Sequence, residues 1–250
     1  MRVQIQSAIE SNALKAMCLI VIIVLMCATA VIGNDLGNTY KILLPGVFDR
    51  SNIGSIDSLG WYGLFKTDSG HVLESVEIRT KSCPAPYSSQ PGDTTGVSIT
   101  VDHPLKPLFL VQCPREFEPG LVTTHFSGDK WINPGQLIML GECGLSAFGQ
   151  LTDEGFRSPR EPLVLDYQVK LFKYPLWYGQ RQVLVEHDRA CAEDTPSIIW
   201  AGDLDRDGQV DLFLDILNHY AGRHYALYLS CEADAGDLVK LVADLFIHGC

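Results

Sequence analysis

Basic residues are scarce in this sequence relative to acidic ones. Its 250 residues include 19 lysines and arginines against 30 aspartates and glutamates, which gives a formal net charge of −11. A chain with this balance lacks the general electrostatic footprint that attracts nucleic acid or anionic lipid surfaces. We therefore expect no nucleic-acid partner, whereas the acidic surplus is compatible with binding cations.

The common signatures of catalysis are also missing. The sequence has no H-E-x-x-H, no Walker loop and no G-x-S-x-G, since Gly144 to Phe148 ends in phenylalanine where the second glycine belongs. In Glu186 to Asp188, a strand would place the central histidine on the face opposite both acids, which is a poor arrangement for a general base. Catalytic groups can be scattered along a chain, so an enzyme is unsupported but stays open.

Long hydrophobic runs are absent except near the start of the chain. Arg2 and Lys15 precede an apolar run from Ala16 to Ile32, and Ala28 to Ala30 offers the small residues that a signal peptidase prefers. This order predicts a signal peptide over residues 1–30, with the rest of the chain periplasmic, on the cell surface or secreted, and no membrane span after cleavage. The run is also close to the length of a membrane span, so an uncleaved anchor is the alternative.

No two cysteines stand in the C-x-x-C spacing that zinc sites usually show. An even number of cysteines follows the signal segment, and in an exported chain this is typical of disulfide bonds. We therefore expect these cysteines to be largely paired, although the sequence cannot choose the pairing. They are Cys83, Cys113, Cys143, Cys191, Cys231 and Cys250.

Glycine and proline are spread through the chain instead of being collected in one linker. Between them lie short β-rich runs, and the clearest is Leu163 to Lys173, which is apolar at every second position. Shorter runs of this kind are Gly96 to Val101, Leu108 to Val111 and Gln136 to Leu140. The pattern predicts a mainly β fold, with antiparallel sheets in a sandwich or propeller-like arrangement.

Two parts of the pattern are ambiguous. The stretch from Leu238 to Phe246 fits the second strand of a hairpin that begins at Tyr225, and we favour this over the alternative of a short C-terminal helix. The polar, turn-rich residues 151–162 are either a loop or a domain boundary. The chain therefore contains two β-rich domains, residues 31–152 and 163–250, or one domain over 31–250.

The sharpest functional signal is a run of alternating aspartates. They stand at positions 1, 3, 5 and 9 of the pattern D-x-D-x-D-G-x-x-D, with Gly208 at position 6. Calcium takes about 6–8 oxygen ligands, and alternate aspartates in a tight loop point at one centre. The glycine permits the sharp turn, and a backbone carbonyl at position 7 adds an oxygen. The expected calcium ligands are Asp203, Asp205, Asp207, Gln209 and Asp211. The alternative is a solvated acidic turn.

The loop differs from an EF-hand at its C-terminal end. Leu214 stands at position 12, where an EF-hand has a bidentate glutamate, and a β run takes the place of the amphipathic helix. The stretch from Trp200 to Asp215 resembles the calcium loops of FG-GAP and VCBS-type repeats in integrin-like propeller blades, where the same pattern leads straight into a strand. This resemblance implies calcium binding by the same residues. A propeller needs repeated blades, and the sequence has no second copy of the motif.

Asp215 is not expected to reach the same ion. It lies four residues after Asp211, which corresponds to about 13 Å along a strand. Asp215, His219 and His224 form either a second polar cluster or solvated loop residues, and we favour the latter because isolated polar loop residues are usually exposed.

Two functions are compatible with these features. The first is an exported calcium-binding β protein, a binding or adhesion module with a structural calcium site, whose ligand would be a protein or a glycan. The second is an extracytoplasmic hydrolase in which calcium is structural or orients the substrate. A pocket with converging histidine and carboxylate side chains would favour the second.

Overall fold

The computed structural model describes residues 40–53, 56–57, 60–86, 92–155, 162–175, 179–192, 195–217 and 222–248. All described residues belong to one compact unit, which lies within Thr39–Cys250. The predicted signal segment, residues 1–30, lies outside the described residues. Within the described ranges, no helix is long and apolar enough to cross a membrane.

The described residues form β-strands joined by turns, together with one short 3-10 helix, η1 (Arg50–Asn52). All ladders between the strands are antiparallel, which confirms the prediction of a mainly β fold built from antiparallel sheets. The strands are β1 (Lys41–Leu43), β2 (Gly46–Asp49), β3 (Trp61–Thr67), β4 (Gly70–Val76), β5 (Ile78–Cys83), β6 (Gly96–Val101), β7 (Phe109–Gln112), β8 (Gly120–Trp131), β9 (Leu137–Leu140), β10 (Cys143–Gly155), β11 (Pro162–Lys173), β12 (Arg181–Cys191), β13 (Ser197–Asp203), β14 (Asp211–Asp215), β15 (Gly222–Leu229) and β16 (Lys240–His248).

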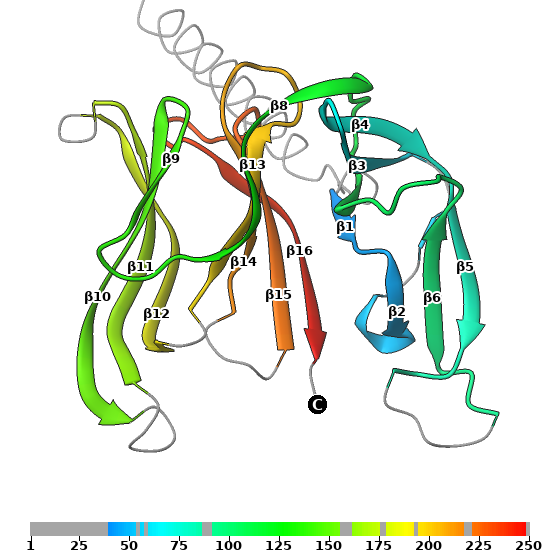
Figure 1. The fold of residues 1–250 in the computed structure, drawn as a ribbon, viewed down its shortest axis with the longest axis horizontal. Helices are drawn as coiled ribbons and strands as arrows, with labels where there is room; N and C mark the ends of the chain where they lie inside the picture. The colour runs from blue at the N-terminus through cyan, green and yellow to red at the C-terminus, as the bar shows by residue number, and fades with distance from the viewer. Residues whose placement is uncertain are drawn as a thin grey trace, which may run out of the picture. The chain divides into compact units, whose positions relative to one another are not determined.

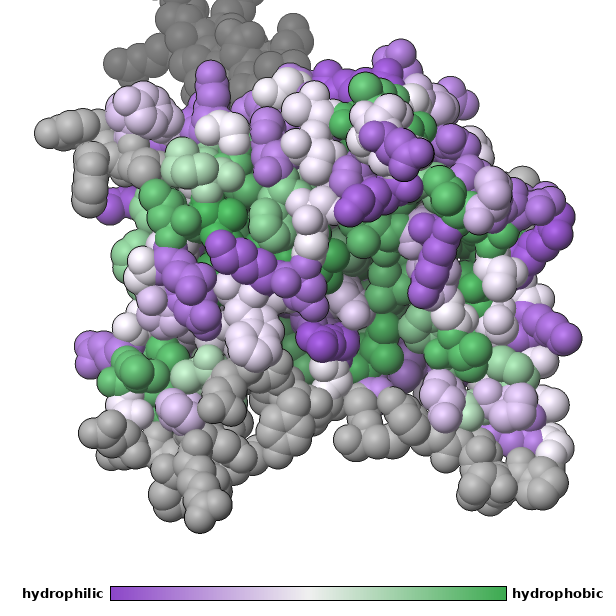
Figure 2. Space-filling view, in the orientation of Figure 1, coloured by the Kyte–Doolittle hydropathy of each residue, from purple (hydrophilic) through white to green (hydrophobic). Residues whose placement is uncertain are grey.

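The largest sheet has nine strands in the order β1-β7-β3-β4-β8-β13-β14-β15-β16. Its two edge strands approach each other, because Ile42 of β1 and Leu245 of β16 belong to one buried apolar cluster and line one cavity. The sheet therefore nearly closes on itself (Figure 1). Figure 2 shows hydrophobic side chains gathered along the line where β16 faces β1 and β2.

A second sheet, β12-β11-β10-β9, packs against the β13–β15 part of the first as one layer of a sandwich. Tyr167, Val169 and Leu171 of β11 are fully buried in the core between the layers, as the alternation predicts. The alternation breaks at Asp166, which has a φ of 51° at a β-bulge, so Val164 enters the core and Leu165 does not. A bulge shifts the phase of a strand by one residue, and the sequence pattern does not reveal it.

The third sheet, β2-β6-β5, packs on the other end of the large sheet. Its contact with β1, β3 and β7 is made by a small apolar cluster that includes Phe48, Ile99 and Trp61. The nine-stranded sheet thus carries a smaller sheet at each end, and the aspartate loop lies between β13 and β14 in its middle.

The two ambiguous stretches are both strands where they are described. The C-terminal stretch is β16, which pairs with β15 from Gly222–His248 to Leu229–Lys240, so the alternative of a C-terminal helix is wrong. Its alternate residues Ala243 and Leu245 face the core. The polar stretch of residues 151–162 connects β10 to β11, and Gly155 pairs with Pro162 in one sheet.

The five described cysteines form no disulfide bonds, which departs from the predicted framework. Cys143 pairs with Lys173 at one end of β11, and Cys191 pairs with Leu163 near the other end. These two positions are ten residues apart, which corresponds to about 33 Å along a strand. Cys113 Sγ donates to the Arg115 carbonyl, and Arg115 Nη2 donates to Cys231 Sγ, so both of these thiols are free and engaged by one arginine. An even cysteine count predicts pairing only where the topology brings thiols together, and the sequence did not contain that information. Cys250 lies outside the described residues.

Candidate metal centre

The aspartate loop connects two buried strands. Asp203 is the last residue of β13, Asp211 is the first residue of β14, and Gly202 pairs with Asp211 across the two strands. Between them the chain turns sharply, with a φ of 62° at Arg206 and 83° at Gly208. A left-handed backbone at Gly208 costs little because glycine has no Cβ. The loop is therefore closed by the pairing of its own flanking strands.

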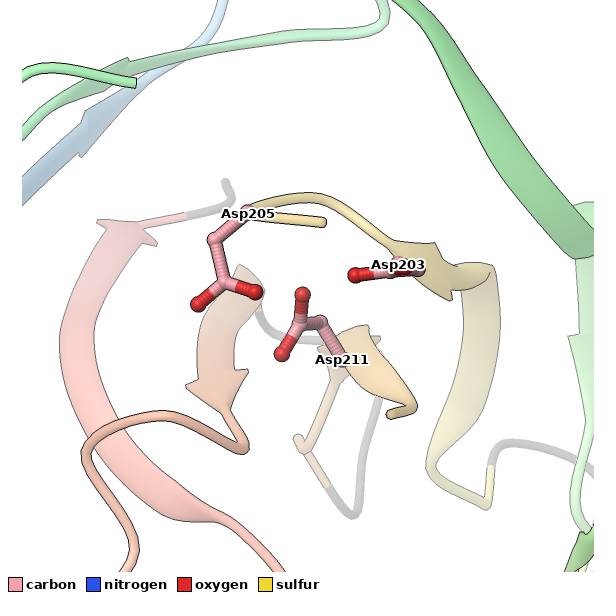
Figure 3. A group of neighbouring side chains, drawn as sticks. All are labelled: Asp203, Asp205 and Asp211. Carbon is pink, nitrogen blue, oxygen red and sulfur yellow. The ribbon is translucent and has the colours of Figure 1, made fainter. Parts of the chain in front are cut away.

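Three of the aspartate side chains converge. Oxygens of Asp203, Asp205 and Asp211 all lie within 4.8 Å of one another. Figure 3 shows the three carboxylates pointing toward a common centre, one from each strand end and one from the loop. Asp211 is fully buried, and Asp203 and Asp205 are partly buried. Carboxylates held this close repel one another, so the arrangement suits a cation.

The electrostatics of the group fit a cation site. Burial, with a smaller contribution from the charge of Asp205, raises the pKa of Asp211 to about 7, against the opposing effect of hydrogen bonds from Ser230 and Leu204. Burial also raises the pKa of Asp203, although the Gly208 N–H lowers it. Asp203 Oδ1 is buried and has no hydrogen-bond partner among the described residues. A buried carboxylate oxygen without a donor is an expected ligand position for a hard cation.

The other two predicted ligands lie at the edge of this group. Asp207 is not one of the three converging carboxylates, because its Oδ1 accepts the Gln209 N–H at 2.7 Å and its Oδ2 lies 3.0 Å from Ser230 Oγ. Gln209 is exposed, and the contact just described is made by its backbone nitrogen. The structure thus brings together Asp203, Asp205 and Asp211, and links Asp207 to them through Ser230.

Two residues that the sequence did not indicate complete the surroundings. Ser230 follows β15, and its N–H and hydroxyl both approach Asp211 Oδ1, at 2.8 and 2.9 Å. Arg115 precedes β8, and its Nη2 lies 2.9 Å from Asp205 Oδ2. Neither residue stands near the motif in the chain, so no local spacing could have identified it.

The neighbouring polar residues that the structure describes, Asp215 and His224, do not form a second group that could hold a metal. Asp215 is buried, not solvated as expected, and its carboxylate accepts hydrogen bonds from Arg223 Nη1 at 2.9 Å and from the His224 N–H at 3.0 Å. His224 Nε2 lies 2.7 Å from Asp244 Oδ2. These contacts tie β14 to β15 and β15 to β16. His219 lies outside the described residues.

A cavity of about 270 Å³ adjoins the loop. Loop residues Gly208 to Val210 line this cavity, and its other lining residues include His125, Glu142 and Lys173. The residues that resembled catalytic motifs are engaged elsewhere: Ser146 Oγ donates to the Gln136 carbonyl, and His187 Nε2 lies 3.0 Å from the Ile216 carbonyl oxygen.

The sequence matches no protein-family model, and searches of curated proteins and of solved structures find no match. The resemblance to FG-GAP and VCBS-type loops therefore rests on the loop motif alone.

Proposed function

We propose that this chain is an exported, calcium-binding β protein that serves as a binding or adhesion module and uses calcium as a structural ion. One observation carries the proposal: Asp203, Asp205 and Asp211 converge within 4.8 Å, and a buried oxygen of Asp203 lacks a hydrogen-bond donor.

Calcium is favoured over other cations by the chemistry of the donors. All the converging groups are carboxylate oxygens, which excludes the nitrogen and sulfur ligands that zinc and copper prefer. Magnesium retains several waters and is seldom held by a loop of protein ligands alone. Side-chain oxygens of Asp203, Asp205 and Asp211 would bind the ion, and the Gln209 carbonyl, Asp207 and water would supply the remaining ligands. We expect a dissociation constant of about 10⁻⁴–10⁻³ M, as in extracellular modules.

A structural role follows from the position of the loop. Asp203 and Asp211 end and begin two paired strands in the middle of the largest sheet, so an ion between them would hold those strand ends together. The signal-peptide features of residues 1–30 support export to surroundings outside the cytoplasm, where a weak calcium site of the extracellular kind would be filled. A protein or a glycan is the partner class that such a module would bind.

The alternative function is an extracytoplasmic hydrolase with a structural or substrate-orienting calcium. The cavity beside the loop favours the hydrolase. Its lining includes His125, Glu142 and Lys173 together with loop residues Gly208 to Val210. Hydrolysis of ester or glycoside substrates that depends on calcium and is lost in His125→Gln would support the enzyme over the binding module.

Calorimetric titration with calcium tests the metal site. We expect one ion per chain for the wild type and at least a tenfold weaker affinity for Asp203→Asn, which removes a ligand charge but preserves the size of the side chain. Asp237→Asn is the matched control, because Asp237 is exposed and lies outside the converging group. If titration of the wild type with calcium released or absorbed no heat, and chelator left its melting temperature unchanged, the loop would be a solvated acidic turn and not a calcium site.

N-terminal sequencing of protein recovered from outside the cytoplasm tests export. The small residues Ala28 to Ala30 predict a mature chain that begins near Val31. A chain that begins at Met1 in a membrane fraction would identify the apolar run as an anchor.

A further inference from the structure

Arg115 forms an ion pair with Asp205, one of the predicted calcium ligands. Its Nη2 lies 2.9 Å from Asp205 Oδ2, and the two residues are 90 positions apart in the sequence. The Asp205 side chain is only 4% exposed, whereas that of Arg115 is 44% exposed. The carboxylate is therefore fixed inside the loop, and the guanidinium reaches it from the solvent side.

Both oxygens of Asp205 already have donors. Oδ1 accepts the N–H of Asp207 at 3.2 Å, and Oδ2 accepts from Arg115. A charge-assisted hydrogen bond is among the stronger interactions that a carboxylate makes. A calcium ion that used Asp205 as a ligand would share the carboxylate with the guanidinium, and the two cations would repel each other at short range.

Arg115 has a second acidic neighbour. The charge of Glu232 acts on the guanidinium together with that of Asp205, and Glu232 Oε1 accepts a hydrogen bond from the Tyr40 hydroxyl at 2.8 Å. No described contact joins Glu232 to the guanidinium, so Asp205 is the carboxylate that bonds to Arg115 among the described residues.

A second arginine offers a contrast inside the same loop. Arg206 also connects the loop to the segment before β8, but its contacts are Glu118, at 3.1 Å, and the Pro119 carbonyl, at 3.0 Å. No described contact joins the Arg206 guanidinium to Asp203, Asp205 or Asp211. The two arginines carry the same charge near the same loop, and only Arg115 bonds to a member of the converging group.

We propose that Arg115 competes with calcium for Asp205 and thereby sets the affinity of the loop for the ion; this inference rests on the proposed calcium site. The arginine lowers the affinity, so the site responds to calcium at a higher concentration than the four aspartates alone would require. Arg115 thus determines the affinity of a site to which it contributes no ligand.

Calorimetric titration of Arg115→Met and Arg206→Met with calcium chloride tests the proposal. Methionine keeps an unbranched apolar stem and removes the charge. We expect the dissociation constant of Arg115→Met to fall about tenfold, the ratio that corresponds to 1.4 kcal/mol. That of Arg206→Met should stay within about threefold of the wild-type value, because the contacts that it loses are to Glu118 and Pro119, neither of which is a predicted calcium ligand. An equal gain in both variants would show a general effect of charge and would overturn the proposal, as would an unchanged Arg115→Met.

A measurement on the wild type covers the case in which Arg115→Met fails to fold. The Nε–H signals of Arg115 and Arg206 can be followed by NMR during the same titration. We expect the Arg115 signal to shift as calcium binds and the Arg206 signal to stay in place, and a shift of Arg206 alone would overturn the proposal. If the wild type binds no calcium at all, the proposed site itself fails, which is distinguishable from a wild type that binds calcium without moving Arg115.

Discussion

Asp211 shows how a buried carboxylate is accommodated in the middle of a sheet. Its two oxygens accept hydrogen bonds from the Leu204 N–H at 2.7 Å and from the Ser230 N–H at 2.8 Å. Burying a charge without such partners would be strongly unfavourable. These hydrogen bonds stabilise the charged carboxylate, but burial raises the pKa of Asp211 by more than they lower it. A bound cation would remove the remaining cost, because it favours the charged form.

Ser230→Ala tests the contribution of the one hydroxyl that approaches two loop carboxylates. We expect the free energy of unfolding in the presence of chelator to fall by about 1–2 kcal/mol, because the fully buried Asp211 loses a donor that the hydroxyl shares with the exposed Asp207. Ser75→Ala, at an exposed position of β4, should change it by less than about 0.5 kcal/mol. Urea denaturation measures both variants, and equal stabilities would mean that water replaces the hydroxyl.

The individual residues of the site were predictable to unequal degrees. Asp203, Asp205 and Asp211 could be identified because the loop is local, so their spacing in the sequence fixes their spacing in space. Arg115 and Ser230 come from segments that only the sheet topology brings to the loop. No periodicity or motif in one sequence encodes such long-range neighbours.

At the scale of the elements, the chain on both sides of the loop is packed more tightly than the loop itself. A Cβ on Gly202 of β13 would overlap the Thr123 carbonyl oxygen of β8 and would lie 2.5 Å from the Trp200 ring. A Cβ on Gly208 would meet nothing within 4 Å, although its φ of 83° disfavours other residues. The two glycines are therefore required for different reasons, close packing in one case and backbone conformation in the other.

The two glycines predict different costs of substitution by alanine. Gly202→Ala should lower the free energy of unfolding by about 3 kcal/mol or more, because a strand must shift to relieve the overlap. Gly208→Ala should lower the free energy of unfolding by about 1 kcal/mol, because alanine is strained in the left-handed backbone conformation of this position. Urea denaturation in chelator compares the two, and a Gly208→Ala variant that is the less stable one would contradict this order.

His71 lies at the junction between β4 and β8, a short ladder that joins the two halves of the large sheet. It is buried, and its two ring nitrogens lie 3.2 Å from Thr124 Oγ1 and 3.0 Å from Ser127 Oγ of β8. Burial lowers the pKa of His71, and the charge of Lys66 adds to the effect. The imidazole is thus held in its neutral form between two hydroxyls.

The lowered pKa of His71 predicts a loss of stability at acidic pH. Below the usual pKa of 6.5 the unfolded chain binds a proton more readily than the folded one, so stability falls as the pH drops from there toward the folded pKa. His71→Gln should flatten this part of the profile of unfolding free energy against pH, whereas His125→Gln, at an exposed position, should leave it unchanged. Profiles that are parallel for the wild type and His71→Gln would rule out this histidine as the cause.

The strands show where sequence patterns succeed at the scale of elements. Gly96 to Val101 is a strand with the predicted bounds, and the predicted runs at 108–111, 136–140 and 163–173 contain β7, β9 and β11 within a residue or two. Alternating apolar residues in these runs face a core. The C-terminal stretch was ambiguous because its five apolar residues fit a helical stripe whereas the rest of the chain is β, and pairing with β15 decides in favour of the strand.

At the scale of the molecule, the sheet order was beyond what one sequence could predict. The nine-stranded sheet joins β4 to β8 and β8 to β13, and these pairings depend on contacts between distant segments. The same topology places the cysteines on separate elements, which is why a count of cysteines failed to predict the bonding of the described ones.

The aspartate loop is coupled to both large cores through one strand. In β13, Trp200 belongs to the apolar cluster inside the nearly closed sheet, and Ala201 belongs to the cluster shared with the four-stranded sheet. Asp203 ends this strand, and Leu212 and Phe213, just after Asp211, again belong to the two different clusters. An ion that fixes the ends of β13 and β14 therefore restrains side chains in both cores, and its effect on unfolding should be global.

Calcium should accordingly raise one cooperative melting transition. At a concentration of 100 times its dissociation constant, an ion that binds only the folded chain raises the free energy of unfolding by about 2.7 kcal/mol. For a domain of this size that corresponds to a rise in Tm of about 5–10 °C. Far-ultraviolet circular dichroism reports the strands, and tryptophan fluorescence reports the buried Trp61 and Trp200, which lie in different apolar clusters. We expect both signals to shift by the same amount in the wild type, and both to shift by about half as much or less in Asp203→Asn, whose affinity for calcium is at least tenfold weaker. If calcium moved the fluorescence transition without moving the dichroism, the ion would stabilise the loop and its neighbours alone, and the coupling through β13 would be wrong.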